Sequence, residues 1–114
     1  MRKFHHFGLP TDDPREGETW VPETKVWVTD PMAHPRKIEF LRYEADSPVT
    51  GPVRDLPHVA FVTDDLEAEL ADAEVLLGPF EAMPGLTVVF VLKEGLVCEY
   101  MAYGEGFAGD WGQA

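Results

Sequence analysis

The sequence predicts an α+β fold that is mainly β-sheet and consists of two related halves in one domain. Six short segments rich in β-branched and aromatic residues have the pattern of strands, and one segment in the second half has the pattern of a helix. An internal repeat, in which each half opens with a histidine and closes with a glutamate, relates the two halves. At 114 residues the chain can bury one core but not two, so the halves are expected to share it.

The second half has the clearer pattern of elements. Its helix is predicted to begin at Thr63-Asp64-Asp65, where Asp64 can cap it and Glu67 is the capping-box partner, and to end near Asp72. Residues 74–77, followed by Gly78-Pro79, are predicted as a short strand, so this half reads β-α-β-β-β. The six main strands of the chain are predicted at residues 3–10, 25–30, 37–43, 57–63, 86–92 and 96–103.

The first half is shorter. Only eleven residues separate Asp13 from Lys25, and they include Pro14, Gly17 and Pro22, so its helix is predicted to be missing or reduced to a turn. We therefore divide the single domain into module one (1–46), a Pro- and Gly-containing linker (47–56), module two (57–103) and a tail (104–114). Phe107 and Trp111 leave two interpretations of the tail, a loose end or a segment pinned by these aromatics.

The repeat singles out four residues that could bind a metal. Residues 6–13 align with residues 58–65 at an offset of 52, with four of eight positions identical, and residues 38–43 align with residues 98–103 at an offset of 60. These alignments pair His6 with His58 and Glu39 with Glu99. Strand alternation places both glutamates among apolar neighbours, where an ionised carboxylate needs a cation, an arginine or a proton. A divalent ion shared by His6, Glu39, His58 and Glu99 is favoured over a metal-free relic of such a site.

The net charge of the chain excludes some classes of binding partner. Nine basic and twenty-one acidic residues give a net charge of −12, which argues against binding to nucleic acids and anionic membranes. The expected partner is a small-molecule substrate. No apolar run reaches the roughly 20 residues that a membrane span requires, and the single cysteine, Cys98, fits a reducing compartment, so a cytoplasmic location is expected. Arg36, Lys37 and Arg42 are positive charges near the Glu39 strand that could hold an anionic substrate, although a role without substrate contact is favoured.

Residues 57–66, which run from Pro57-His58 through Thr63-Asp64-Asp65 to Leu66, and the closing Cys98-Glu99-Tyr100-Met101 resemble the vicinal oxygen chelate superfamily. This superfamily includes glyoxalase I, bleomycin-resistance proteins and extradiol dioxygenases. The resemblance extends through Tyr103 and implies two β-α-β-β-β-type modules that form a curved mixed sheet around a cleft, the first lacking most of its helix. It implies that His6, Glu39, His58 and Glu99 bind one divalent ion (Ni, Co, Zn, Mn or Fe). The pattern is most similar to that of bacterial glyoxalase I, but the short first module puts glutathione as the substrate in doubt.

This ligand set fits a lyase or isomerase. Two histidines and two carboxylates leave an octahedral ion two neighbouring positions for the adjacent oxygens of a substrate. Chelation polarises a hydroxy-carbonyl group and stabilises the enediolate that forms when the neighbouring C–H loses its proton. The resemblance to glyoxalase I makes Glu99 the first candidate for the catalytic base and Glu39 the second.

Two other functions stay open, and an assembly is expected. A metal-free protein that binds a drug-like cation, resembling bleomycin-resistance proteins, would use an acidic cleft together with Trp20, Trp27 and Tyr103. An interaction module that has kept the fold without the chemistry is the other alternative. A first module without its helix would expose apolar sheet surface and a strand edge, so the sequence predicts a two-fold homodimer.

Overall fold

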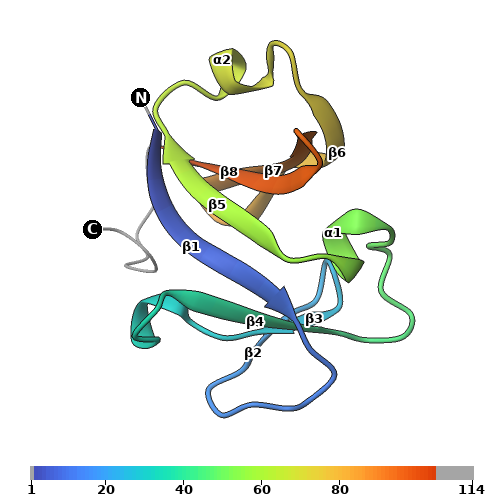
Figure 1. Ribbon diagram of the computed structural model, residues 1–114. Helices are drawn as coiled ribbons and strands as arrows, with labels where there is room; N and C mark the ends of the chain where they lie inside the picture. The colour runs from blue at the N-terminus through green and yellow to red at the C-terminus, as the bar shows by residue number, and fades with distance from the viewer. Residues whose placement is uncertain (1, 105–114) are drawn as a thin grey trace.

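A single mixed sheet of eight strands forms the body of the protein in the computed structural model, which describes residues 2–104. The strand order in the sheet is β2-β3-β4-β1-β5-β8-β7-β6, and the sheet curls strongly about its central strands (Figure 1). The strands are β1 (Arg2–Pro10), β2 (Thr19–Val21), β3 (Val26–Val28), β4 (Ile38–Tyr43), β5 (His58–Thr63), β6 (Glu74–Met83), β7 (Leu86–Lys93) and β8 (Leu96–Tyr103). All six predicted main strands are present, with ends displaced by a few residues.

Helical structure is scarcer than the α+β prediction implies. The described residues contain the 3₁₀ turn η1 (Pro31–Ala33) and two short helices, α1 (Pro52–Asp55) and α2 (Leu66–Leu70), so the fold is mainly β. α2 is the predicted helix, but its N-cap is Asp65, whose side chain accepts a hydrogen bond from the Ala68 amide at 3.1 Å. The prediction that Asp64 caps this helix is therefore wrong by one residue. None of the helices in residues 2–104 is long and apolar enough to cross a membrane.

Two edge strands differ from the predictions. β2 lies where only a turn is predicted, because Thr19-Trp20-Val21 pairs with β3. β6 continues through Gly78-Pro79, the predicted stop, and its pairing with β7 shifts register on both sides of that pair. An edge strand tolerates proline because one side of its backbone has no neighbouring strand to accept a hydrogen bond. The absence of a helix between β1 and β2 agrees with the prediction.

The core lies on both faces of the second half of the sheet. On one face Leu86, Val88 and Phe90 pack with Val49 and Val53, so the predicted linker contributes to the core. On the other face Cys98, Tyr100 and their neighbours on β7 pack against Leu66 and Leu70 of α2 and against Ala73, which follows that helix. The tail from residue 105 onward, with Phe107 and Trp111, lies outside the described residues.

Candidate metal centre

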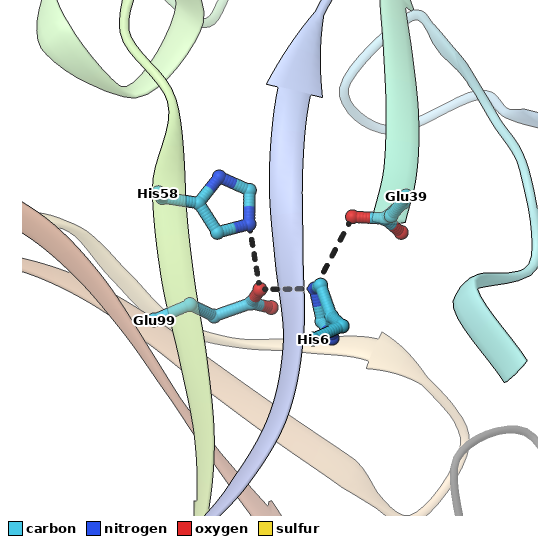
Figure 2. A group of neighbouring side chains, drawn as sticks. All are labelled: His6, Glu39, His58 and Glu99. Atoms are coloured by element: carbon cyan, nitrogen blue, oxygen red, sulfur yellow. Dashed lines mark ion pairs between the residues drawn. The ribbon is translucent and has the colours of Figure 1, made fainter. Parts of the chain in front are cut away.

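The four residues that the repeat pairs converge at the centre of the sheet. Glu39 lies on β4, His6 on β1, His58 on β5 and Glu99 on β8, which are the four consecutive central strands. Their side chains point toward one another (Figure 2), and one ligand atom from each lies within 4.8 Å of the others. All four are buried, with exposed fractions between 0% and 7%. A single chain therefore brings together every residue that the sequence predicts as a metal ligand.

Strand register explains how side chains from separate strands meet. Gly8 of β1 is level with Glu39 on one side and His58 on the other. Ala60 of β5 is level with His6 on one side and Glu99 on the other. His6 thus reaches Glu99, two strands away, across the small side chain of Ala60, and the absence of a side chain at Gly8 leaves room for His58 beside Glu39. Sequence reasoning did not identify Gly8 and Ala60, although they occupy the same position of the repeat and are both small.

The contacts within the cluster link both histidines to Glu99. His6 Nε2 lies 3.4 Å from Oε1 of Glu39 and 3.4 Å from Oε1 of Glu99, and His58 Nε2 lies 3.2 Å from the same Glu99 oxygen (Figure 2). Glu99 therefore contacts both rings, whereas Glu39 contacts His6. Despite its closeness to Glu99, neither ring nitrogen of the buried His58 makes a hydrogen bond within the described part of the chain. A buried imidazole without hydrogen bonds is costly, and a metal ion would satisfy it.

The carboxylates change the protonation of the site. Burial by itself lowers the pKa of His6, but interactions with Glu39 and Glu99 outweigh it and raise that pKa from 6.5 to about 10. For Glu99, burial acts to raise the pKa, while His58 and His6 lower it below its ordinary value. The metal-free cluster is thus held together at neutral pH by a protonated His6 between carboxylates. A divalent ion would replace this proton with a stronger positive charge.

A bulge in β1 adds a second histidine behind His6. Simple alternation predicts that His5 faces away from the cluster, but the pairing of β1 with β5 shifts register between Phe4 and His6. His5 is buried, and its Nδ1 lies 2.5 Å from Nδ1 of His6. His6 therefore meets His5 through Nδ1 and the carboxylates through Nε2. A hydrogen bond to the second nitrogen is the usual way to orient a metal-binding imidazole.

The donor set fits a divalent transition metal. Two imidazole nitrogens and two carboxylate oxygens suit first-row ions of this class, and the two carboxylate charges balance the charge of the ion. One cation would explain both the unsatisfied hydrogen-bonding groups of His58 and the burial of the two glutamates. The cluster is accordingly a possible divalent metal site.

A cavity of about 310 Å³ opens onto the cluster. Glu39 and Glu99 line it, together with apolar side chains from both halves of the curled sheet, including Leu41 of β4 and Val88 and Phe90 of β7. Alternation along β4 predicts that Leu41 and Tyr43 share the face of Glu39, and both line the cavity. Burial and the charges of Glu39 and Glu99 raise the pKa of Tyr43, so its hydroxyl stays protonated at neutral pH.

The aromatic residues considered for cation binding lie elsewhere. The rings of Trp20 and Trp27 contact each other in a tilted arrangement with centroids 5.0 Å apart, and Trp27 Nε1 donates a hydrogen bond to Glu44. Neither tryptophan, nor Tyr103, is among the described residues that line the cavity. Arg42, considered for an anionic substrate, is held by Glu18 through two hydrogen bonds of 2.7 and 2.9 Å and does not line the cavity either.

Fold and site together describe a mainly β protein whose curled sheet holds a possible divalent metal site. Comparison with models of protein families and with curated proteins found no match. Among solved structures, the chain is similar to the hypothetical protein BH1468 from Bacillus halodurans C-125, with a TM-score of 0.67 and 17% sequence identity over 95% of this chain and 99% of that one. At this identity the likeness concerns the fold alone.

Proposed function

We propose that this chain is a divalent-metal-dependent enzyme of the vicinal oxygen chelate type, with a glyoxalase-like lyase or isomerase activity on a small substrate that carries adjacent oxygens. The observation that carries the proposal is the cluster of four buried His and Glu ligands within 4.8 Å at a cavity. The strand order supports duplicated modules, because β2-β3-β4-β1 and β6-β7-β8-β5 run inward from opposite edges in the same sequence. In this proposal module one spans 1–46 and module two 57–103.

His6, Glu39, His58 and Glu99 would hold the ion. When bound, the ion would polarise the two adjacent substrate oxygens and stabilise the enediolate produced when the neighbouring C–H loses its proton. The chain itself supplies a carboxylate to accept that proton and an apolar cavity that keeps water from the reacting carbon. The Tyr43 hydroxyl, protonated at neutral pH, can donate a hydrogen bond to a ligand in the cavity.

Glu99 is the first candidate for the base and Glu39 the second. Both carboxylates line the cavity, so either can reach a bound substrate. Their surroundings differ, since Oε1 of Glu99 contacts His6 and His58, while Oε1 of Glu39 contacts His6. This difference makes Glu99→Gln and Glu39→Gln matched controls for each other. The residue that acts as the base should lose about 10²–10⁴-fold in rate when it becomes glutamine, far more than it loses in metal occupancy.

The test first measures metal binding and then measures exchange of the substrate C–H hydrogen with solvent. Elemental analysis of the purified protein should find about one divalent ion per site, and His58→Ala should weaken metal binding at least about tenfold. The metallated protein should then catalyse exchange of the C–H hydrogen of 2-hydroxy-carbonyl compounds or hemithioacetals with deuterated solvent, and a chelator should abolish it. Unchanged metal affinity in both His58→Ala and Glu99→Gln would disprove the metal centre. A metallated protein that exchanges no compound of this panel would disprove the reaction.

A metal-free protein that binds a small cation is the second candidate. It is supported by the lining of the cavity, which among the described residues includes carboxylates but no lysine, arginine or histidine. The cluster itself argues the other way, because Glu39 and Glu99 already face His6 and His58. Tight binding of cationic aromatic compounds to protein free of metal, without any exchange activity, would favour this function. Protein that binds neither metal nor small molecules would indicate an interaction module.

A further inference from the structure

The walls of the cavity restrict what can fill it. At about 310 Å³ it lies near the lower end of the range for ligand sites, about 300–1,000 Å³, so its occupant is small. Val26 and Leu41 from the first half and Leu86 and Val88 from the second line it, and all four are buried. An apolar wall cannot replace the water around an ionised group, and the transfer of such a group costs several kcal/mol. The walls therefore favour a ligand with an apolar body.

The charged residues that line the cavity are all negative. Asp30, Glu39 and Glu99 are its charged lining residues, and none of the described lining residues is basic. A divalent ion would balance Glu39 and Glu99, and Asp30 is exposed with its carboxylate accepting a hydrogen bond from the Met32 amide. No cation among the described lining residues is left for a second negative group on a ligand. The net charge of −12 acts in the same direction at longer range.

Arg42, Arg15 and Arg54 each contact another side chain of the protein. Arg42 is held by Glu18, and the Arg15 guanidinium lies 3.6 Å from the ring centroid of Phe40, a residue that does not line the cavity. Arg54 lies over the ring of Tyr43, 5.9 Å from its centroid, and lines a polar depression that shares Leu41 and Tyr43 with the cavity. None of these three arginines is among the described residues that line the cavity.

We infer that the site takes a small uncharged ligand with an apolar body and one pair of adjacent oxygens, and that it rejects ligands whose far end carries a carboxylate or phosphate. This inference rests on the proposed function, since the paired oxygens are those that would chelate the ion. The adjacent oxygens lie at the Glu39 and Glu99 end of the cavity, and the apolar body lies against the walls from β3, β4 and β7. The hydroxyl groups of Thr19, Thr24 and Tyr43 line the same cavity and can hydrogen-bond uncharged polar groups.

The experiment compares two chelators that differ only at the far end. Hexanohydroxamic acid and the monohydroxamate of adipic acid share a six-carbon chain and the same pair of adjacent oxygens, and the second ends in a carboxylate. Protein loaded with Co²⁺ is titrated with each, and the dissociation constant is read from the visible absorption of the cobalt. Hexanohydroxamic acid should bind at least about tenfold more tightly, because burial of the terminal carboxylate of the adipic probe is unfavourable.

A charge placed in the cavity should reverse part of this preference. Thr24 lines the cavity and lies in a turn, outside the strand ladders, so Thr24→Arg adds a guanidinium without breaking the sheet. The variant should bind the adipic probe at least about threefold more tightly than the wild type does. Thr50→Arg is the matched control, since Thr50 is exposed and lies outside the cavity lining, and it should leave the ratio of the two constants unchanged.

The outcomes separate this inference from the proposed function. Equal or tighter binding of the adipic probe by the wild type, with cobalt absorption changing for both, overturns the inference and leaves the metal centre intact. Cobalt that binds without responding to either probe, or protein that binds no cobalt, overturns the proposed function and the inference with it. Tighter binding of the uncharged probe, with the ratio shifted by Thr24→Arg and not by Thr50→Arg, supports both.

Discussion

Replacement of Gly8 by alanine should displace the His58 ring from the centre of the sheet. A Cβ added at Gly8 would overlap with Cε1 and Nε2 of His58 and would lie 2.5 Å from Nδ1. His58 is 3% exposed, so the ring has no open space beside it and must turn or push the strands apart. Because Gly8 has no side chain to bind an ion, an effect on metal binding would act through displacement of His58 or of the strands that carry the other ligands.

The expected change in unfolding free energy caused by Gly8→Ala differs between the wild type and the His58→Ala variant. In the wild type, the added methyl group should cost about 1–3 kcal/mol of unfolding free energy, as in other overpacked cores. With His58→Ala the space is vacant, and Gly8→Ala should stabilise the strand by about 0.5–1 kcal/mol, because alanine loses less backbone freedom on folding. The coupling free energy between the two positions is therefore about 1.5–4 kcal/mol. Gly8→Ala alone should also weaken metal binding at least about tenfold, since one ligand leaves its place.

A double-mutant cycle measures this coupling. Urea unfolding of the wild type, Gly8→Ala, His58→Ala and the double variant, all in the presence of a chelator, gives the four free energies without any contribution from metal. Metal titration of the wild type and of Gly8→Ala gives the second quantity. The same cost for Gly8→Ala in both backgrounds would refute the reasoning, and so would an unchanged metal affinity in a folded Gly8→Ala protein.

Three further predictions concern the metal, the proton and the assembly. Metal at 100 times its dissociation constant should raise the free energy of unfolding by about 2.7 kcal/mol, and chelator should reverse the gain in a urea titration. Since the pKa of His6 is raised from 6.5 to about 10, the contribution of this residue to the stability of the metal-free protein should be complete below pH 6.5 and lost as pH rises through 10. Metal binding at pH 7.5 should release about one proton, which calorimetry in buffers of different ionisation enthalpy measures. Light scattering at micromolar concentration should show a dimer, because Phe4 and Phe7 are 40% and 47% exposed on the helix-free half; a monomer would contradict this.

The sequence predicts the four candidate metal ligands because the same two residue types, histidine and glutamate, recur in both halves of the chain. A lone strand histidine carries little information, but His6 and His58 recur at one offset and Glu39 and Glu99 at another. Period-two alternation then places each of them on the inward face, and it also places Leu41 and Tyr43 on the face that lines the cavity. The main strands are predicted for the same reason, since each combines β-branched residues with a bounding Pro, Gly or Asp.

The features that the sequence does not predict depend on how strands pair in the sheet, which the sequence of a single strand does not determine. Whether a strand continues through Gly78-Pro79 depends on its position at the sheet edge, which the strand order decides. The burial of His5 depends on a bulge opposite β5, and the role of Gly8 depends on its being level with His58. Register across strands separated by fifty residues is set by tertiary packing, so local patterns do not contain it.

The lack of a helix between β1 and β2 is compatible with the cluster, because a covering helix and the cluster concern opposite faces of the sheet. On β8, Glu99 alternates with Cys98 and Tyr100, and these two pack on the outer side beneath Leu66 and Leu70 of α2. A helix in the first half would occupy the equivalent outer side of β1 and β4, away from the cluster. The short connection between β1 and β2 therefore leaves the outer surface without helical cover and does not affect the inner face that carries the two histidines and two glutamates.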